Sequence, residues 1–134
     1  MSKLTHEMKE AINKSVLLPL ATASNMGIPN VIPIKFVFVE NDDELWLVDN
    51  FFMKTLQNLK QNPLVALYVY LQEDSICFQV KGTVDIQTSG TAYNRMKEMV
   101  CQERPDLPAK SLIVMHITDI YQCLPGNNAG DRIN

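Results

Sequence analysis

The spacing of apolar residues near the N-terminus is that of an amphipathic helix. Leu4, Met8, Ala11 and Ile12 stand at positions i, i+4, i+7 and i+8, so they share one helical face. Thr5 is suited to cap this helix, because its hydroxyl can accept a hydrogen bond from an N–H group of the first turn. The pattern therefore predicts a helix over residues 5–14.

Most of the remaining chain consists of short runs rich in β-branched and aromatic residues, which are typical of strands. Two segments return to helical spacing: residues 52–61, which end before Pro63, and a helix capped by Ser89 that ends before Pro105. The predicted strands cover residues 16–24, 30–40, 45–48, 64–71, 75–87 and 111–124. An acidic turn at residues 40–44 joins the second and third strands as a hairpin.

The order of these elements predicts the fold class. Short turns between neighbouring strands favour antiparallel pairing, and the regular strand–helix alternation of a parallel sheet is missing. We predict a mainly β (α+β) fold: a six-stranded antiparallel split β-barrel of Greek-key type with three peripheral helices. A chain of 134 residues is the size of one domain, so residues 1–134 are expected to form a single domain.

Composition and charge narrow the function classes. The net charge of −3 and the dispersed arginines provide no basic surface for a nucleic acid. The three cysteines and two histidines lack metal-ligand spacing, so we expect reduced thiols and no metal site. The apolar run at residues 16–21 is too short for a signal peptide, and no run reaches the roughly 20 residues of a membrane span. We therefore expect a cytoplasmic protein that binds no membrane.

The only candidate for ligand chemistry is the junction between the third strand and the second helix. Familiar catalytic motifs are missing from the sequence, so any redox or group-transfer chemistry would come from a cofactor. A helix that starts near Lys54 presents free N–H groups, while Lys54 adds a charge and Thr55 a hydroxyl. This arrangement predicts a phosphate site. The alternative is that both residues are merely solvated on an amphipathic helix.

Several short segments also occur in a characteristic order along the chain. They are Leu20 to Ala23, Pro29 to Lys35, Leu45 to Val48, Lys54 to Leu67 with its Asn62-Pro63 pair, and Val80 to Val84. In this order, from about Ala11 to Gly126, the sequence resembles the flavin-binding split-barrel family related to pyridoxamine 5′-phosphate oxidase, especially its small FMN-binding members. The stretch from Lys54 through Asn62-Pro63 is the most distinctive part of the resemblance.

This resemblance implies a homodimer with FMN in a groove between the subunits. In this resemblance the phosphate would be held by Lys54 and Thr55. The isoalloxazine would be flanked by Ile32, Pro33, Ile34 and Lys35. The ring or the ribityl chain would be lined by Val48, Asp49, Asn50 and Met53. By strand alternation Lys35 shares a face with Val31, Pro33 and Val37, an unusual place for a cation. A lysine near the N1–O2 edge would stabilise the anionic reduced flavin. The alternative is a lysine that extends into solvent at the rim of the barrel.

The resemblance also implies an FMN-dependent oxidoreductase or flavin reductase, supplied with electrons by a nicotinamide donor or a redox partner protein. The C-terminal segment lacks the histidine-containing substrate region of the vitamin-converting oxidases, so pyridoxamine phosphate is not the expected substrate. The site also lacks the arginines that some relatives place around the phosphate, which predicts a modest FMN affinity. Three alternatives stay open: a non-catalytic FMN electron carrier, the same fold binding deazaflavin or haem, and a binding or regulatory domain without cofactor.

Overall fold

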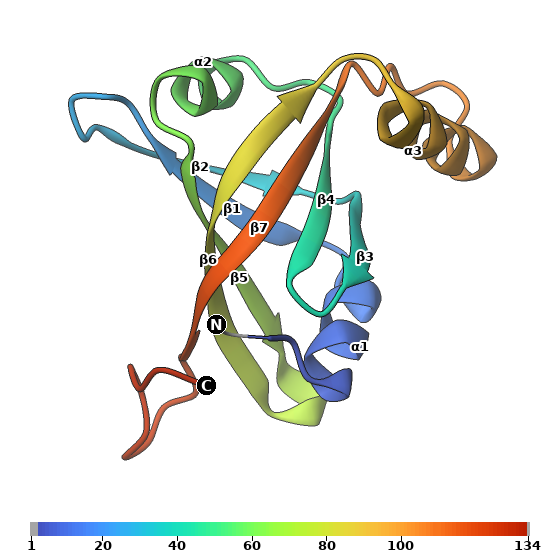
Figure 1. Ribbon diagram of the computed structural model, residues 1–134. Coiled ribbons are helices and arrows are strands. Elements are labelled where there is room, and N and C mark those ends of the chain that lie inside the picture. The colour runs from blue at the N-terminus through green and yellow to red at the C-terminus, as the bar shows by residue number, and fades with distance from the viewer. Residues whose placement is uncertain (1–2, 134) are drawn as a thin grey trace.

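The computed structural model describes residues 3–133, and this part of the chain forms a single curled sheet with helices around it (Figure 1). The elements in chain order are α1 (His6–Lys14), β1 (Leu18–Ala23), β2 (Pro29–Ile34), β3 (Val37–Asn41), β4 (Glu44–Asp49), α2 (Lys54–Gln61), β5 (Leu64–Leu71), the 3-10 turn η1 (Gln72–Asp74), β6 (Ile76–Gln87), α3 (Thr91–Glu103) and β7 (Ser111–Gln122). The predicted antiparallel split barrel with three helices is confirmed.

The order of strands explains why the sheet curls. The strands follow the order β2-β1-β5-β6-β7-β4-β3, so β2 and β3 occupy opposite edges, yet only Lys35 and Phe36 lie between them in the chain. In a flat sheet these edges would be roughly 29 Å apart, at about 4.8 Å per strand spacing. The chain from Ile34 to Val37 can span at most about 11 Å. The sheet must therefore curl until its two edges approach each other.

The number of strands differs from the prediction. The expected single strand over residues 30–40 is divided into β2 and β3, which makes seven strands in the described part of the chain instead of six. The physical reason is a change of partner: Ile34 is paired with Leu18 of β1, whereas Val37 is paired with Leu47 of β4. Since β1 and β4 lie in different parts of the sheet, one continuous strand could not pair with both.

The inside of the barrel is the main hydrophobic core. Its most deeply buried side chains include Leu20, Leu45, Leu47, Leu67, Val80 and Met115. Helix α1 contacts β3 and β5 and adds Met8, Ala11 and Ile12 to this core. The predicted cap is confirmed, because the Met8 N–H donates to Thr5 Oγ1 at 3.2 Å.

Helix α3 covers a second apolar cluster on the outer side of the sheet. Met96 and Val100 of this helix pack with Trp46 of β4 and Val114 of β7. The predicted cap at Ser89 is wrong: the helix begins after Gly90, whose φ of 101° turns the chain into the helix without a side-chain cap.

The outer side of β2, β1 and β5 has no such cover. Ala21 of β1 is paired with Val31 of β2 on one side and with Ala66 of β5 on the other, so these residues share one face of the sheet. We call this the uncovered face; it comprises Ala21, Val31, Pro33, Leu64, Ala66, Tyr68 and Tyr70. Val31 is 65% exposed and Leu64 is 59% exposed, so this face presents large apolar side chains to solvent.

Among residues 3–133, no helix is long and apolar enough to cross a membrane.

Candidate functional site

A groove opens beside β2 and the link to β3. Its volume is about 450 Å³, within the range of small-molecule sites. The lining residues are Leu17, Ile32, Pro33, Ile34, Lys35, Phe36, Val48, Asn50, Phe51, Phe52, Arg104 and Leu107. The walls are mostly apolar, and the lining contains two cations, Lys35 and Arg104, but no carboxylate. This surface fits a ligand that combines an apolar body with negative charge.

The residues predicted to bind a cofactor divide into two groups. Those that line the groove are Ile32, Pro33, Ile34, Lys35, Val48 and Asn50. Those outside its lining are Asp49, Met53, Lys54 and Thr55. The second group surrounds the start of α2, which begins two residues after the groove residue Phe52.

Lys35 lies at the solvent side of the groove. Ile34, the last residue of β2, is buried, whereas Pro33 before it and Lys35 after it are exposed. The expectation that Lys35 shares a face with Val37 is wrong, because Val37 is buried after the link has turned the chain toward β4. The ammonium group is thus free to meet a ligand that enters the groove from solvent.

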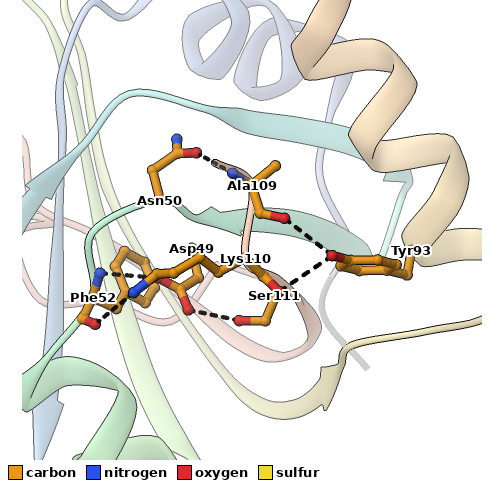
Figure 2. A network of polar contacts seen from close by, with 7 residues as sticks. All are labelled: Asp49, Asn50, Phe52, Tyr93, Ala109, Lys110 and Ser111. Atoms are coloured by element: carbon orange, nitrogen blue, oxygen red, sulfur yellow. Dashed lines mark hydrogen bonds and ion pairs between the residues drawn. The ribbon is translucent and has the colours of Figure 1, made fainter. Parts of the chain in front are cut away.

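Asp49 lies between the groove residues Val48 and Asn50 in the chain, and its buried carboxylate is bonded within the protein (Figure 2). The side chain is 0% exposed; it accepts hydrogen bonds from the Phe52 N–H at 2.9 Å and the Ser111 hydroxyl at 2.7 Å. The Lys110 ammonium lies 3.8 Å from the same carboxylate. Asp49 therefore holds the turn that carries three groove residues, Asn50, Phe51 and Phe52.

The same network fixes the loop after α3 (Figure 2). The Asn50 side-chain oxygen accepts the Ala109 N–H at 2.9 Å, and the Tyr93 hydroxyl donates to the carbonyls of Ala109 and Lys110 at 3.3 and 3.4 Å. Ala109 has a φ of 42°, a left-handed conformation that a non-glycine residue adopts only when its surroundings hold it. These bonds position the loop that contributes Leu107 to the groove.

The start of α2 keeps the features of an anion site. Lys54 is exposed. The first-turn N–H groups of any helix lack intrahelical acceptors, and here no capping side chain accepts from them. Thr55 is only 2% exposed, and its hydroxyl oxygen accepts a hydrogen bond from the Asn30 amide at 3.0 Å. Asn30 and Asn58 both donate to Thr22, at 3.3 and 3.0 Å. This cluster ties α2 to β1 and β2, while the Thr55 hydroxyl hydrogen can still be donated.

The sequence did not reveal six residues of the groove lining: Leu17, Phe36, Phe51, Phe52, Arg104 and Leu107. Arg104 is the charged one among them. Its guanidinium binds the Asp106 carboxylate through two hydrogen bonds of 3.0 and 2.8 Å, which lower the pKa of Asp106 below its usual value. Arg104 lines the groove beside β2, whereas the arginines predicted to be missing are those around the phosphate, so that expectation stays a prediction. Arg104 precedes the helix-ending Pro105, but only the path of the following loop decides which surface it faces. Within residues 3–133, no group of three or more His, Cys, Asp or Glu residues is placed to hold a metal ion.

The amino-acid sequence is similar to those of known proteins. The family described as pyridoxamine 5′-phosphate oxidase matches residues 4–124. An uncharacterized protein of Methanocaldococcus jannaschii is 35% identical over 133 residues, which cover 98% of this chain and 88% of that protein.

Solved structures show the same architecture. HupZ of Group A Streptococcus superimposes with a TM-score of 0.82 at 29% identity, covering 95% of this chain and 99% of that one. An FMN-binding protein from Syntrophomonas wolfei subsp. wolfei has a TM-score of 0.74 at 20% identity, with 84% and 80% of the two chains covered. At that identity, the second similarity concerns the fold alone.

Proposed function

This chain belongs to the pyridoxamine 5′-phosphate oxidase family, and from that premise we propose that it is an FMN-binding oxidoreductase or flavin reductase. The observation that carries the proposal is the groove beside β2, with apolar walls, the exposed cation Lys35 and no carboxylate in its lining; the second cation, Arg104, is paired with Asp106. The start of α2, with Lys54 and unbonded N–H groups, lies next to it in the chain. Together they offer one surface for a flat apolar ring and another for a phosphate.

The residues present fit FMN in charge as well as in shape. A phosphate carries negative charge, which the helix start and the Lys54 ammonium stabilise. Asp49, the acidic residue nearest to both surfaces in sequence, is buried, and the Lys110 ammonium at 3.8 Å offsets the negative charge of its carboxylate. Ile32, Ile34 and Val48 provide apolar contacts for a ring.

When bound, FMN supplies the hydride and single-electron chemistry that side chains lack. The role of the protein is to bind FMN and to set its reduction potential. Lys35 would place its ammonium beside the negative charge that reduction creates, which favours the reduced state. The Asp49 network would hold Asn50 and Phe52 in place against the ligand, since the turn between them is fixed by hydrogen bonds. Electrons would come from a nicotinamide donor or a redox partner protein.

We propose further that the protein works as a homodimer. Pro33 belongs both to the uncovered face and to the lining of the groove, so the two surfaces are continuous. A second subunit on the uncovered face would remove Val31 and Leu64 from water, which is favourable at about 25 cal/mol for each Å² of apolar area. The same contact would close one side of the groove and exclude water from it.

The proposal is tested by titrating the purified apo-protein with FMN and following flavin fluorescence. We expect micromolar or tighter binding, weakened at least about tenfold, or ~1.4 kcal/mol, by Lys54→Ala, because this substitution removes the cation at the helix start. Lys60→Ala is the matched control: Lys60 is exposed in the last turn of the same helix, so its loss should leave the affinity unchanged.

Two outcomes would contradict the proposal. Absence of binding by the folded wild-type protein would exclude FMN, and an absorption spectrum of the protein as isolated would then show whether deazaflavin or haem is present instead. Equal losses in Lys54→Ala and Lys60→Ala would exclude a specific phosphate site at the start of α2. For the loaded protein, steady-state reduction by NADH or NADPH supports the reductase, whereas reduction only by a protein partner supports an electron carrier.

A further inference from the structure

Two cysteines that are distant in sequence lie opposite each other in the sheet. Phe78 of β6 is paired with Gln122 of β7, so the next residues outward, Cys77 and Cys123, are also opposite each other. The Cys123 N–H donates to the Cys77 carbonyl at 2.9 Å, so the ladder continues to this pair. Residues directly opposite each other in an antiparallel ladder have Cα atoms about 4.5–5.5 Å apart and side chains on the same face. This separation lies within the range of about 4.4–6.8 Å found for disulfides.

The surroundings of the two sulfur atoms differ. The Tyr68 hydroxyl lies 3.2 Å from Cys77 Sγ. This contact, together with burial, raises the pKa of Tyr68 to about 12, so the phenol keeps its proton at neutral pH and can donate it to a sulfur anion at Cys77. Burial and the neighbouring Cys77 sulfur raise the pKa of Cys123 above its usual value, so Cys123 is a thiol at neutral pH. The Tyr68 hydroxyl can donate a hydrogen bond to Cys77 Sγ, whereas Cys123 Sγ lies 3.9 Å from the Tyr121 carbonyl oxygen. Cys77 is therefore the sulfur placed to attack, and Cys123 the one placed to resolve.

We propose that Cys77 and Cys123 form a reversible cross-strand disulfide when the protein reacts with hydrogen peroxide. The Cys77 thiolate attacks one peroxide oxygen, the O–O bond breaks, and the departing hydroxide takes a proton to become water. The resulting Cys77 sulfenic acid is attacked by the Cys123 sulfur; the S–O bond breaks, a second water leaves and the S–S bond forms. Two thiols lose two hydrogen atoms in total, and one peroxide is reduced to two molecules of water.

The third cysteine takes no part in this reaction. Cys101 is exposed near the end of α3, a helix that packs on β7 through Met96 and Val100 beside Trp46 and Val114. Cys123 follows the other end of β7, after Gln122. The 12-residue strand β7 (Ser111–Gln122) therefore separates Cys101 from Cys123, so Cys101 lies far from this pair. The disulfide would instead close the chain segment from residue 77 to residue 123 at the end of the β6–β7 ladder.

The test treats the reduced full-length protein with an equimolar amount of hydrogen peroxide and counts free thiols in denaturant. We expect the count to fall from three to one and the mass to fall by that of two hydrogen atoms, and dithiothreitol to restore both. Trypsin separates the three cysteines, because Lys81, Lys97 and Lys110 lie between them. Non-reducing digestion should therefore give one linked pair of peptides, containing Cys77 and Cys123.

Variants assign the roles of the individual sulfurs. Cys101→Ser is the matched control and should lose both of its remaining thiols at the wild-type rate. Cys123→Ser should accumulate a sulfenic acid at Cys77 that dimedone labels, whereas Cys77→Ser should keep both thiols and take up no label. A linked peptide containing Cys101, a disulfide between two molecules, or direct overoxidation of Cys77 to sulfinic acid in the wild-type protein would overturn the proposal. None of these measurements depends on flavin binding.

Discussion

A buried carboxylate is compatible with a stable fold only when hydrogen bonds replace the water it has lost. Asp49 meets this condition through the Phe52 N–H and the Ser111 hydroxyl, with Lys110 nearby as a counter-charge. The three partners come from the turn before α2 and from the start of β7. One side chain thus connects the turn that lines the groove with the start of β7.

For this residue we expect a large effect of truncation. Asp49→Ala leaves the Ser111 hydroxyl and the Phe52 N–H without their acceptor, so it should lower the free energy of unfolding by about 2–4 kcal/mol. Urea denaturation followed by tryptophan fluorescence measures this change. Asp106→Ala, which removes a solvent-exposed carboxylate, is the control and should leave the urea midpoint almost unchanged. Equal midpoints for the two variants would contradict a positioning role for Asp49.

Among the elements, the pairing of β6 with β7 depends on one glycine. The register shifts between Lys81 and Gly82, and a Cβ atom at Gly82 would lie 2.3 Å from the backbone carbonyl oxygen of His116. The neighbour is main chain, which cannot rotate away as a flexible side chain could. Only glycine allows the two strands to approach this closely while the bulge bends β6 along the barrel.

Gly82→Ala should therefore destabilise the barrel although alanine is small and apolar. We expect a loss of about 2–4 kcal/mol, because the strands must move apart or the bulge must change register. Thermal unfolding followed by circular dichroism gives the shift in melting temperature. Lys81→Ala, at the neighbouring exposed position, should produce a much smaller shift. A Gly82→Ala variant with the wild-type melting temperature would show that the strands do not approach as described.

Elements with local signals were predictable, and those that depend on distant partners were not. Helix α1 follows from its apolar spacing and the Thr5 cap, both of which are local. The break at Lys35 and Phe36 depends on which strand pairs with each half, and Gly90 begins α3 through its backbone conformation. Likewise, the resemblance to a known family pointed to the residues of β2 that line the groove. Arg104 directly follows α3, and no local sequence pattern shows that it lines the groove.

At the scale of the whole molecule, the surface of the barrel is covered unevenly. Helix α3 shields the outer side of β4 and β7, whereas the uncovered face on β2, β1 and β5 presents Val31 and Leu64 to solvent. A monomer would keep this apolar surface in water at a cost in free energy and solubility. Our proposal that a second subunit covers it makes the oligomeric state a direct test.

We expect the wild-type protein to sediment as a dimer at micromolar concentration and Val31→Arg to sediment as a monomer. Because Val31 is already exposed in the single chain, the substitution should not disturb the barrel itself, and circular dichroism would confirm this. Glu98→Lys, an exposed charge reversal on α3, should remain dimeric. A monomeric wild-type protein, or a dimer unaffected by Val31→Arg, would contradict an interface on the uncovered face.

The short connection between the two edge strands also limits how far apart β2 and β3 can lie beside the groove. Only Lys35 and Phe36 separate β2 from β3, and both residues line the groove. Each residue added to this connection would raise the maximum separation of the strand ends by about 3.5 Å. The length of this connection therefore limits the width of the ligand that fits the groove. An insertion at this point would let a bulkier ligand fit without changes to the hydrophobic core.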